Sequence, residues 1–200
     1  MTRSSRTAPP VDGRSQRSVR SRQQIVTALI ELVREGELLP TADQVASRAG
    51  VGLRTVFRHF QDMESLYAEM HERMREHMRS SIVELFDETA IQGSLEERVR
   101  EGVRLRATLF ESIAPFKRSE VVQRWNSSFL KGKNEEMVRE LRAGLKRTLP
   151  ETDACSAPIA RAVELLTSFE AWDRLRTDQR LGPEQAREVI ETALRELLGG

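Results

Sequence analysis

Few of the features that mark secreted, disulfide-bonded or membrane proteins occur in this sequence of 200 residues. Cys155 is the single cysteine, so no disulfide can form within the chain, and a reducing intracellular compartment is expected. No run of about 18 apolar residues could cross a membrane, and the first residues lack the apolar segment of a secretory signal. We therefore expect a cytoplasmic protein without membrane contacts.

Aromatic residues make up only 5% of the chain, and glycine and proline are also scarce. The abundant residues are Leu, Ala, Arg and Glu, which favour helices over strands. No segment alternates apolar and polar residues as a half-buried strand does. The sequence therefore predicts an all-α fold of about nine helices, with a core for one domain or two small ones.

The charge is nearly balanced overall but unevenly distributed along the chain. Residues 1–60 contain ten arginines and five acids, whereas the remainder contains 22 basic and 26 acidic residues. Residues 1–17 are rich in Arg, Ser, Thr and Pro, and are predicted to form a disordered basic tail. This distribution suggests that only the first part of the chain meets a polyanion.

Two short helices joined by a tight turn follow the tail. An apolar stripe first predicts a helix from about Val19 to Arg34. Thr41 and Gln44 have the spacing of a capping box, which opens a short helix. The residues Gly50-Val51-Gly52 make the turn, and a second helix is expected from about Leu53 to Phe60.

A helix in this arrangement can enter the major groove of DNA. The residues expected to face outward are Leu53, Arg54, Thr55, Arg58 and His59. Arg54 suits a bidentate contact with guanine or a phosphate contact, and Thr41 at a helix start can hold a phosphate. The alternative is a helical hairpin without a DNA role, and the basic tail favours DNA binding.

Residues 41–60, TADQVASRAGVGLRTVFRHF, resemble the helix-turn-helix of the TetR family of bacterial regulators. The family pattern runs roughly T-x-x-x-I-A-x-x-A-G-V-S-x-G-T-L-Y-x-H-F, followed by x-x-K-x-x-L. The match covers about residues 20–67 and is specific. The last two helices are similar to the family's dimerisation region, which is a weaker match.

The resemblance implies a DNA-binding domain at residues 18–62 and an effector-binding and dimerisation domain at residues 63–200. It also implies a homodimeric repressor that a small-molecule effector releases from a palindromic double-stranded operator. The candidate dimer residues are Phe169, Trp172, Val189, Ile190, Leu194 and Leu197. The apolar stripe of the last helix, residues 183–198, can serve as core, as dimer interface or as both.

Three positions depart from the family pattern. Arg54 stands where the family has glycine, Phe57 where it has tyrosine, and Met63 where it has lysine. The first adds a long cation next to the bases, and the other two remove phosphate contacts. The expected DNA-binding set is Arg20, Thr41, Leu53, Arg54, Thr55, Phe57, Arg58 and His59.

Arginines also precede the first helix, at positions 14, 17, 20 and 22. A basic arm of this kind could enter the minor groove. It could equally be a solvated segment that adds only salt-dependent attraction.

The remaining helices are expected at about residues 62–88, 94–115, 158–177 and 183–198. Asp62 is the expected N-cap of the first, and Ser94 with Glu97 forms a second capping box. Helical spacing in residues 116–149 is predicted to be interrupted at Gly132.

Candidate residues for an effector pocket are aromatic or flexible apolar residues with two polar partners. They are Met74, His77, Phe86, Arg104, Phe110, Trp125 and Phe129. The alternative for each apolar residue is a plain position in the core of the helix bundle.

Nothing in the sequence indicates catalysis, a metal or a cofactor. His71 and His77 lie six residues apart, about 240° around a helix, so they do not share a face. No phosphate-binding glycine loop, zinc motif or nucleophile pattern is present. We therefore expect that the protein is not an enzyme. The alternatives to a regulator are a helical protein that binds DNA without sequence preference and a small helical enzyme.

Overall fold

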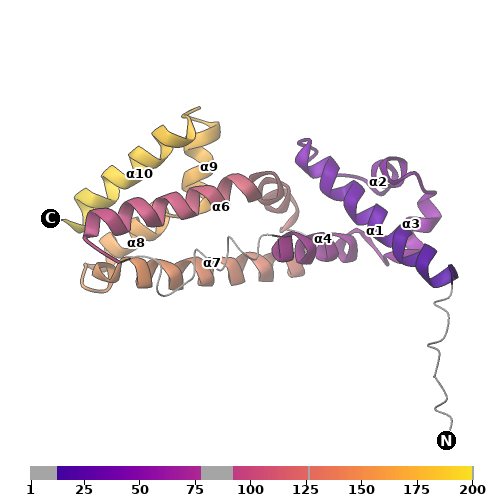
Figure 1. Ribbon diagram of the computed structural model, residues 1–200, viewed down its shortest axis with the longest axis horizontal. Helices are drawn as coiled ribbons and strands as arrows, with labels where there is room; N and C mark the ends of the chain where they lie inside the picture. Colours follow the sequence, from indigo (N-terminus) through magenta and orange to yellow (C-terminus); the bar gives the residue numbers. More distant parts are fainter. Residues whose placement is uncertain (1–12, 78–91, 126, 200) are drawn as a thin grey trace, which may run out of the picture. The chain divides into compact units, whose positions relative to one another are not determined.

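The computed structural model describes residues 13–77, 92–125 and 127–199. Within these ranges it contains nine α-helices, one 3-10 helix and no strand, which confirms the predicted all-α fold (Figure 1). The chain divides into two compact units, residues 1–71 and 72–200. No helix among the described residues is long and apolar enough to cross a membrane.

The N-terminal unit is built on a long helix that packs against two short ones. Its elements are α1 (Gly13–Arg34), α2 (Ala42–Ala49), α3 (Leu53–His59) and the first part of α4 (Met63–His77). Helix α1 contacts both α2 and α3 (Figure 1). The buried residues include Ile25, Val26, Leu29, Val33, Val45, Ala46, Val56, Phe60 and Leu66.

Helix α1 begins at Gly13, earlier than the predicted start at Val19. The expectation of disorder is therefore wrong for residues 13–17, while residues 1–12 lie outside the described residues. The side chains of residues 16–20 are exposed, so this extension gains little from packing. Its arginine and glutamine residues are good helix formers, and they continue a helix that the packed residues nucleate.

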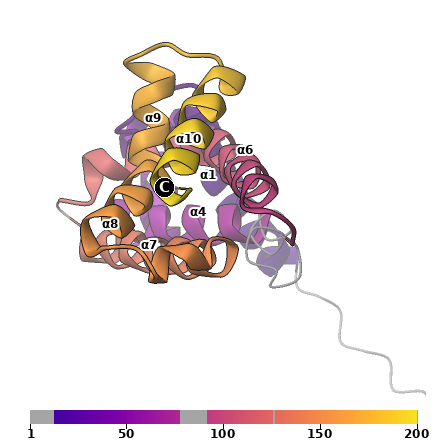
Figure 2. The same ribbon diagram turned by 90° about the vertical axis from the view of Figure 1, so that its left-hand side faces the viewer.

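The C-terminal unit is a bundle of helices joined by short connections. Its elements are α6 (Leu95–Gln123), α7 (Ser128–Thr148), η1 (Pro150–Asp153), α8 (Ala157–Leu166), α9 (Phe169–Thr177) and α10 (Pro183–Leu198). Helix α10 contacts α6, α8 and α9, and α6 also contacts α7 (Figure 2).

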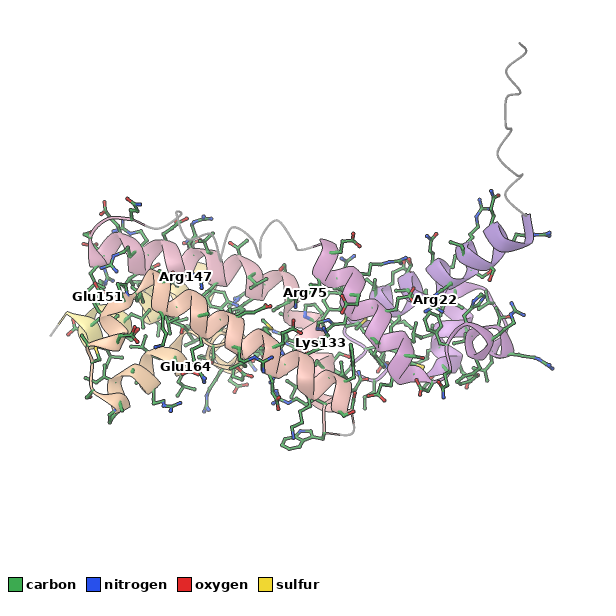
Figure 3. The ribbon with its side chains drawn as sticks, turned by 90° about the horizontal axis from the view of Figure 1, so that it is seen from below. Arg22, Arg75, Lys133, Arg147, Glu151 and Glu164 are labelled. Atoms are coloured by element: carbon green, nitrogen blue, oxygen red, sulfur yellow. The ribbon has the colours of Figure 1, made fainter. Side chains whose placement is uncertain are left out.

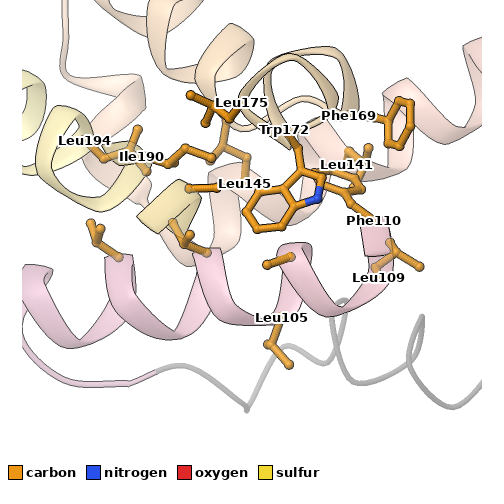
Figure 4. Close-up of a cluster of buried hydrophobic side chains, with 14 of the residues drawn as sticks. Leu105, Leu109, Phe110, Leu141, Leu145, Phe169, Trp172, Leu175, Ile190 and Leu194 are labelled. Atoms are coloured by element: carbon orange, nitrogen blue, oxygen red, sulfur yellow. The ribbon is translucent and has the colours of Figure 1, made fainter. Parts of the chain in front are cut away.

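One apolar cluster fills this bundle. It includes Val99, Val103, Phe110, Leu141, Leu145, Val163, Trp172, Leu175, Ile190 and Leu194 (Figure 4). The rings of Phe110 and Phe169 meet edge to face, with centroids 5.8 Å apart. The buried indole of Trp172 donates to Glu111 Oε1 at 2.9 Å, so its polar atom is satisfied.

The predicted caps of α4 and α6 are both present. Ser94 accepts a hydrogen bond from the Glu97 backbone N–H, and the Glu97 carboxylate accepts one from Ser94 N. Asp62 caps α4, because its carboxylate accepts from Ser65 N at 2.8 Å. The predicted continuation of α4 over residues 78–88 lies outside the described residues.

Two predicted helix breaks are wrong. Helix α6 continues through Pro115 to Gln123, and α7 continues through Gly132. Proline removes one backbone hydrogen bond and glycine costs about 1 kcal/mol of helix propensity. Packing outweighs the cost of the proline, since Lys117, Ser119 and Glu120 beyond it are buried. Gly132 itself is exposed, and buried Leu130 and Leu141 on either side of it pack α7.

The prediction of a single helix over residues 158–177 is also wrong, because the structure has two helices, α8 and α9, in this range. Ser168 separates them, and its hydroxyl accepts from Ala171 N at 3.2 Å as the N-cap of α9. The hydroxyl of Thr167 donates to Val163 O at 2.9 Å and completes the end of α8. These local hydrogen bonds compete with a continuous helix.

We expect Leu194→Ala to lower the free energy of unfolding by about 2–5 kcal/mol, since this fully buried side chain would leave a cavity. Val122→Ala on the exposed side of α6 is the control and should change it by less than about 0.5 kcal/mol. Urea unfolding followed by circular dichroism measures both. Equal effects of the two substitutions would contradict the placement of the core.

Candidate nucleic-acid interface

The turn between α2 and α3 is fixed by a glycine in a left-handed conformation. Gly50 has a φ of 66°, and its N–H donates to the carbonyl of Ser47 at 3.2 Å. Val51 N donates to Ala46 O at 3.0 Å, which completes a Schellman ending of α2. Gly52 then starts α3 directly, so the two helices are joined by a turn of three residues.

The first helix of the pair begins with the predicted capping box. Gln44 N donates to Thr41 Oγ1 at 3.2 Å, and Thr41 N donates to Gln44 Oε1 at 2.7 Å. The Thr41 hydroxyl oxygen therefore acts as an acceptor toward its own helix. Its hydroxyl proton is still available to donate, as a phosphate contact requires.

Helix α3 presents most of its predicted outward residues to solvent. Leu53, Arg54, Phe57 and Arg58 are exposed, whereas Val56 is buried. Arg54 and Arg58 are one turn apart and share a face. Thr55 is half-buried, so it is a weaker candidate for a base contact than the sequence suggested.

His59 does not have the outward position that the sequence predicted. The residue is half-buried, and its Nε2 is buried without a hydrogen-bond partner. Burial, together with the charges of Arg58 and Arg22, lowers the pKa of His59. The imidazole is therefore neutral at neutral pH and adds no charge to the surface of α3.

Arg22 is a structural residue of the N-terminal unit (Figure 3). Its guanidinium donates to the His59 carbonyl at 2.5 Å, pairs with Glu69 of α4, and lies 4.2 Å from the centre of the Phe60 ring. These contacts join α1 to the end of α3 and to α4. The interpretation of Arg22 as part of a basic arm or a solvated segment is therefore wrong.

The other arginines of the expected arm and of α2 differ in their surroundings. Arg17 and Arg20 are exposed on α1, and the side chain of Arg14 lies outside the described residues. Arg48 on α2 donates to both carboxylate oxygens of Glu35, at 2.8 and 2.7 Å. The charge of Arg48 is thus neutralised locally.

The five described residues among the seven predicted to line an effector pocket have different surroundings. Trp125 is 83% exposed, and Arg104 pairs with Glu101 at 2.6 Å. Phe110 belongs to the apolar cluster, Met74 is buried, and Phe129 is half-buried. Phe86 and the side chain of His77 lie outside the described residues.

A cavity of about 320 Å³ lies elsewhere in the C-terminal unit, between residues of α6, α7, α8 and α9. The buried Arg106 is one of its lining residues, and sequence reasoning missed it. A signal was present: Arg106 stands between Val103 and Phe110 with the spacing of the apolar face of α6. A charged residue on such a face indicates either a structural bond or a ligand.

The predicted dimer residues lie mostly inside one chain. Phe169, Trp172, Ile190 and Leu194 are buried in the apolar cluster of the single chain, so they belong to its core, and their contact with a second subunit stays a prediction. Leu197 packs partly against the same cluster. Val189 on α10 is 43% exposed, and it is the most accessible of the six to a partner.

We expect the free energy of unfolding to fall between about pH 6.5 and 5.5, because the unfolded chain takes up a proton on His59 that the folded chain, with its lowered pKa, resists. The effect should be absent from His59→Gln, and carboxylates titrate mainly below this window. Denaturant midpoints of both proteins across the range measure it. Identical slopes in the two proteins would refute the burial of Nε2.

No family model matches the sequence, and no curated protein matches it either. Two solved structures have a similar fold. SCO7518 of Streptomyces coelicolor A3(2), named as a candidate transcriptional regulator, has a TM-score of 0.61 at 20% identity, covering 90% of this chain and 99% of its own. A transcriptional regulator of Rhodococcus sp. Rha1, RHA1_ro04179, also has a TM-score of 0.61 at 16% identity, covering 90% of this chain and 97% of its own. At these identities the likeness establishes the fold and leaves the activity to be argued from this chain's own residues.

Proposed function

We propose that this protein is a sequence-specific DNA-binding regulator of transcription that reads the major groove with α3. The observation that carries the proposal is the surface of α3, on which Arg54, Phe57 and Arg58 are exposed next to a rigid turn. Neither arginine forms an ion pair within the described part of the chain, so both cations are available to a polyanion. Both similar structures are named as transcriptional regulators, which supports the same assignment.

Each exposed group has a role in this proposal. Arg54, near the start of α3, reaches the O6 and N7 atoms of guanine, a contact that discriminates bases by about 1–3 kcal/mol. Arg58 and Arg20 bind phosphates and set the register without reading sequence. Thr41 donates its hydroxyl proton to a phosphate, and the rings and methyl groups of Phe57 and Leu53 contact thymine methyls or the sugar edge.

We further infer that the protein is a homodimeric repressor. Two copies of α3 related by a two-fold axis would reach successive major grooves of a palindromic operator. A small molecule that binds the C-terminal unit would favour a dimer geometry in which this match is lost. The free energy of operator binding would then weaken by at most the difference between the ligand's binding free energies for the two dimer geometries.

The first test is a binding titration against the DNA upstream of the protein's own reading frame. We expect Arg54→Ala to weaken specific binding by about 1–3 kcal/mol, because a bidentate base contact is lost. Arg147→Ala is the matched control, since it removes one exposed arginine from the C-terminal unit and should leave specific binding unchanged (Figure 3).

Two salt concentrations and an excess of competitor DNA separate the alternatives. Specific binding that survives the competitor and depends on Arg54 supports a regulator. Equal binding by all three proteins, abolished by salt, indicates a polyanion surface without sequence preference.

Dimerisation is tested at Val189, the exposed apolar residue of α10. We expect Val189→Glu to shift the protein from dimer to monomer, because the substitution buries an unpaired charge in the interface. Sedimentation velocity measures the shift, with Val122→Glu on α6 as the control. A wild-type protein that is monomeric at micromolar concentration would refute the dimer directly.

A further inference from the structure

Arg106 is a buried cation without a carboxylate partner in the described part of the chain. It is 7% exposed, and burial lowers the pKa of its guanidinium to about 10, so it remains charged at neutral pH. Its Nη1 donates to Thr167 O at 3.0 Å and its Nη2 to Leu141 O at 2.6 Å. A guanidinium has five N–H donors, and these two carbonyls satisfy two of them.

The two carbonyl bonds have a structural role of their own. They tie α6 to α7 and to the end of α8, where a cation is favourable beside the unpaired carbonyls. They do not neutralise the charge, and a buried unpaired charge is costly. A bound anion would offset this cost, because it would pair with the charge of Arg106. We therefore infer that an anion completes the site.

The cavity of about 320 Å³ provides the space for such an anion (Figure 4 shows the labelled Leu141, Leu145 and Phe169 of its wall). Its apolar lining comes from Met137, Val138, Leu141, Leu145, Leu165 and Phe169. The volume lies at the lower end of the range of ligand sites, about 300–1,000 Å³. The cavity therefore suits a small ligand that is mostly apolar.

The other charges at the cavity are largely paired among themselves. Lys117 contacts Glu120 at 2.8 Å and Asn134 at 2.8 Å, and the Arg142 side chain pairs with Glu164 at 2.5 Å. Arg161 and Glu170 are exposed, so solvent screens them. Arg106 is thus the buried lining charge, among the described residues, that still requires an anion.

We propose that this cavity binds a small amphipathic monocarboxylate, with its carboxylate on Arg106 and its apolar tail against Leu141, Leu145 and Phe169. A carboxylate matches the planar guanidinium and adds charge-assisted hydrogen bonds. A tail of about eight carbons suits the small, mostly apolar cavity. The ligand's action as the effector rests on the proposed function, whereas its binding does not.

The test is isothermal titration calorimetry of the full chain with octanoate, 1-octanol and octylamine. These probes share the tail and differ in the charge of the head group. We expect octanoate to bind once per chain and at least about tenfold more tightly than octanol, because only the carboxylate pairs with Arg106. Octylamine should not bind, since it would place two cations together.

Two substitutions separate the head group from the tail. Arg106→Gln keeps a donor but removes the charge, and should abolish the preference for octanoate over octanol. Leu165→Trp fills the cavity from its exposed edge without touching Arg106, and should weaken both ligands at least about tenfold. Val122→Trp is its matched control, because Val122 is also an exposed apolar residue and does not line the cavity. If Arg106→Gln fails to fold, Leu165→Trp still tests whether octanoate binds in this cavity.

Equal affinities for octanoate and octanol, or no binding of octanoate up to about 1 mM by folded protein, would overturn the proposal and leave Arg106 as a purely structural bond. The DNA titration is run on the same samples. Octanoate binding without operator binding would refute the regulator, whereas operator binding without octanoate binding would refute only the ligand site.

Discussion

The candidate DNA-reading surface depends on the backbone of one residue, Gly50. Its left-handed conformation ends α2 and allows α3 to start three residues later, at Leu53. A side chain at this position would strain the turn, because L-residues with a β-carbon rarely adopt a φ of 66°. Val56 then sets the rotation of α3 by entering the core. These two constraints prevent α3 from rotating about its axis. Arg54 and Arg58 lie on the side of the helix opposite Val56, so they are exposed.

Sequence reasoning succeeded where the determinants are local. The capping boxes at Thr41 and Ser94 and the turn at Gly50 each depend on residues within a few positions, so their patterns are visible in the sequence. It failed at Pro115 and Gly132, because buried residues on either side of each position pack the helix and outweigh the local preference. Propensity is a weak term beside the burial of an apolar face.

The candidate functional residues also divide into those with local determinants and those that depend on distant contacts. The exposed face of α3 could be predicted from helical spacing, but the burial of His59 Nε2 could not, because it depends on neighbours that folding brings together. The cavity escaped prediction for a similar reason. Its lining comes from four helices, and the polar atoms at Arg106 are carbonyls, which every residue has. Of the aromatic residues chosen instead, Phe110 is a core residue and Trp125 is exposed.

The two tryptophans of this chain have opposite environments. Trp125 is 83% exposed, whereas Trp172 is 2% exposed and hydrogen-bonded to Glu111. Their fluorescence should therefore differ, with a red-shifted, quencher-accessible emission from the first and a blue-shifted, protected emission from the second. Replacing Trp125 by phenylalanine would leave the second indole as a single optical reporter inside the bundle. The protein thus carries a built-in probe of its own interior that requires no attached dye.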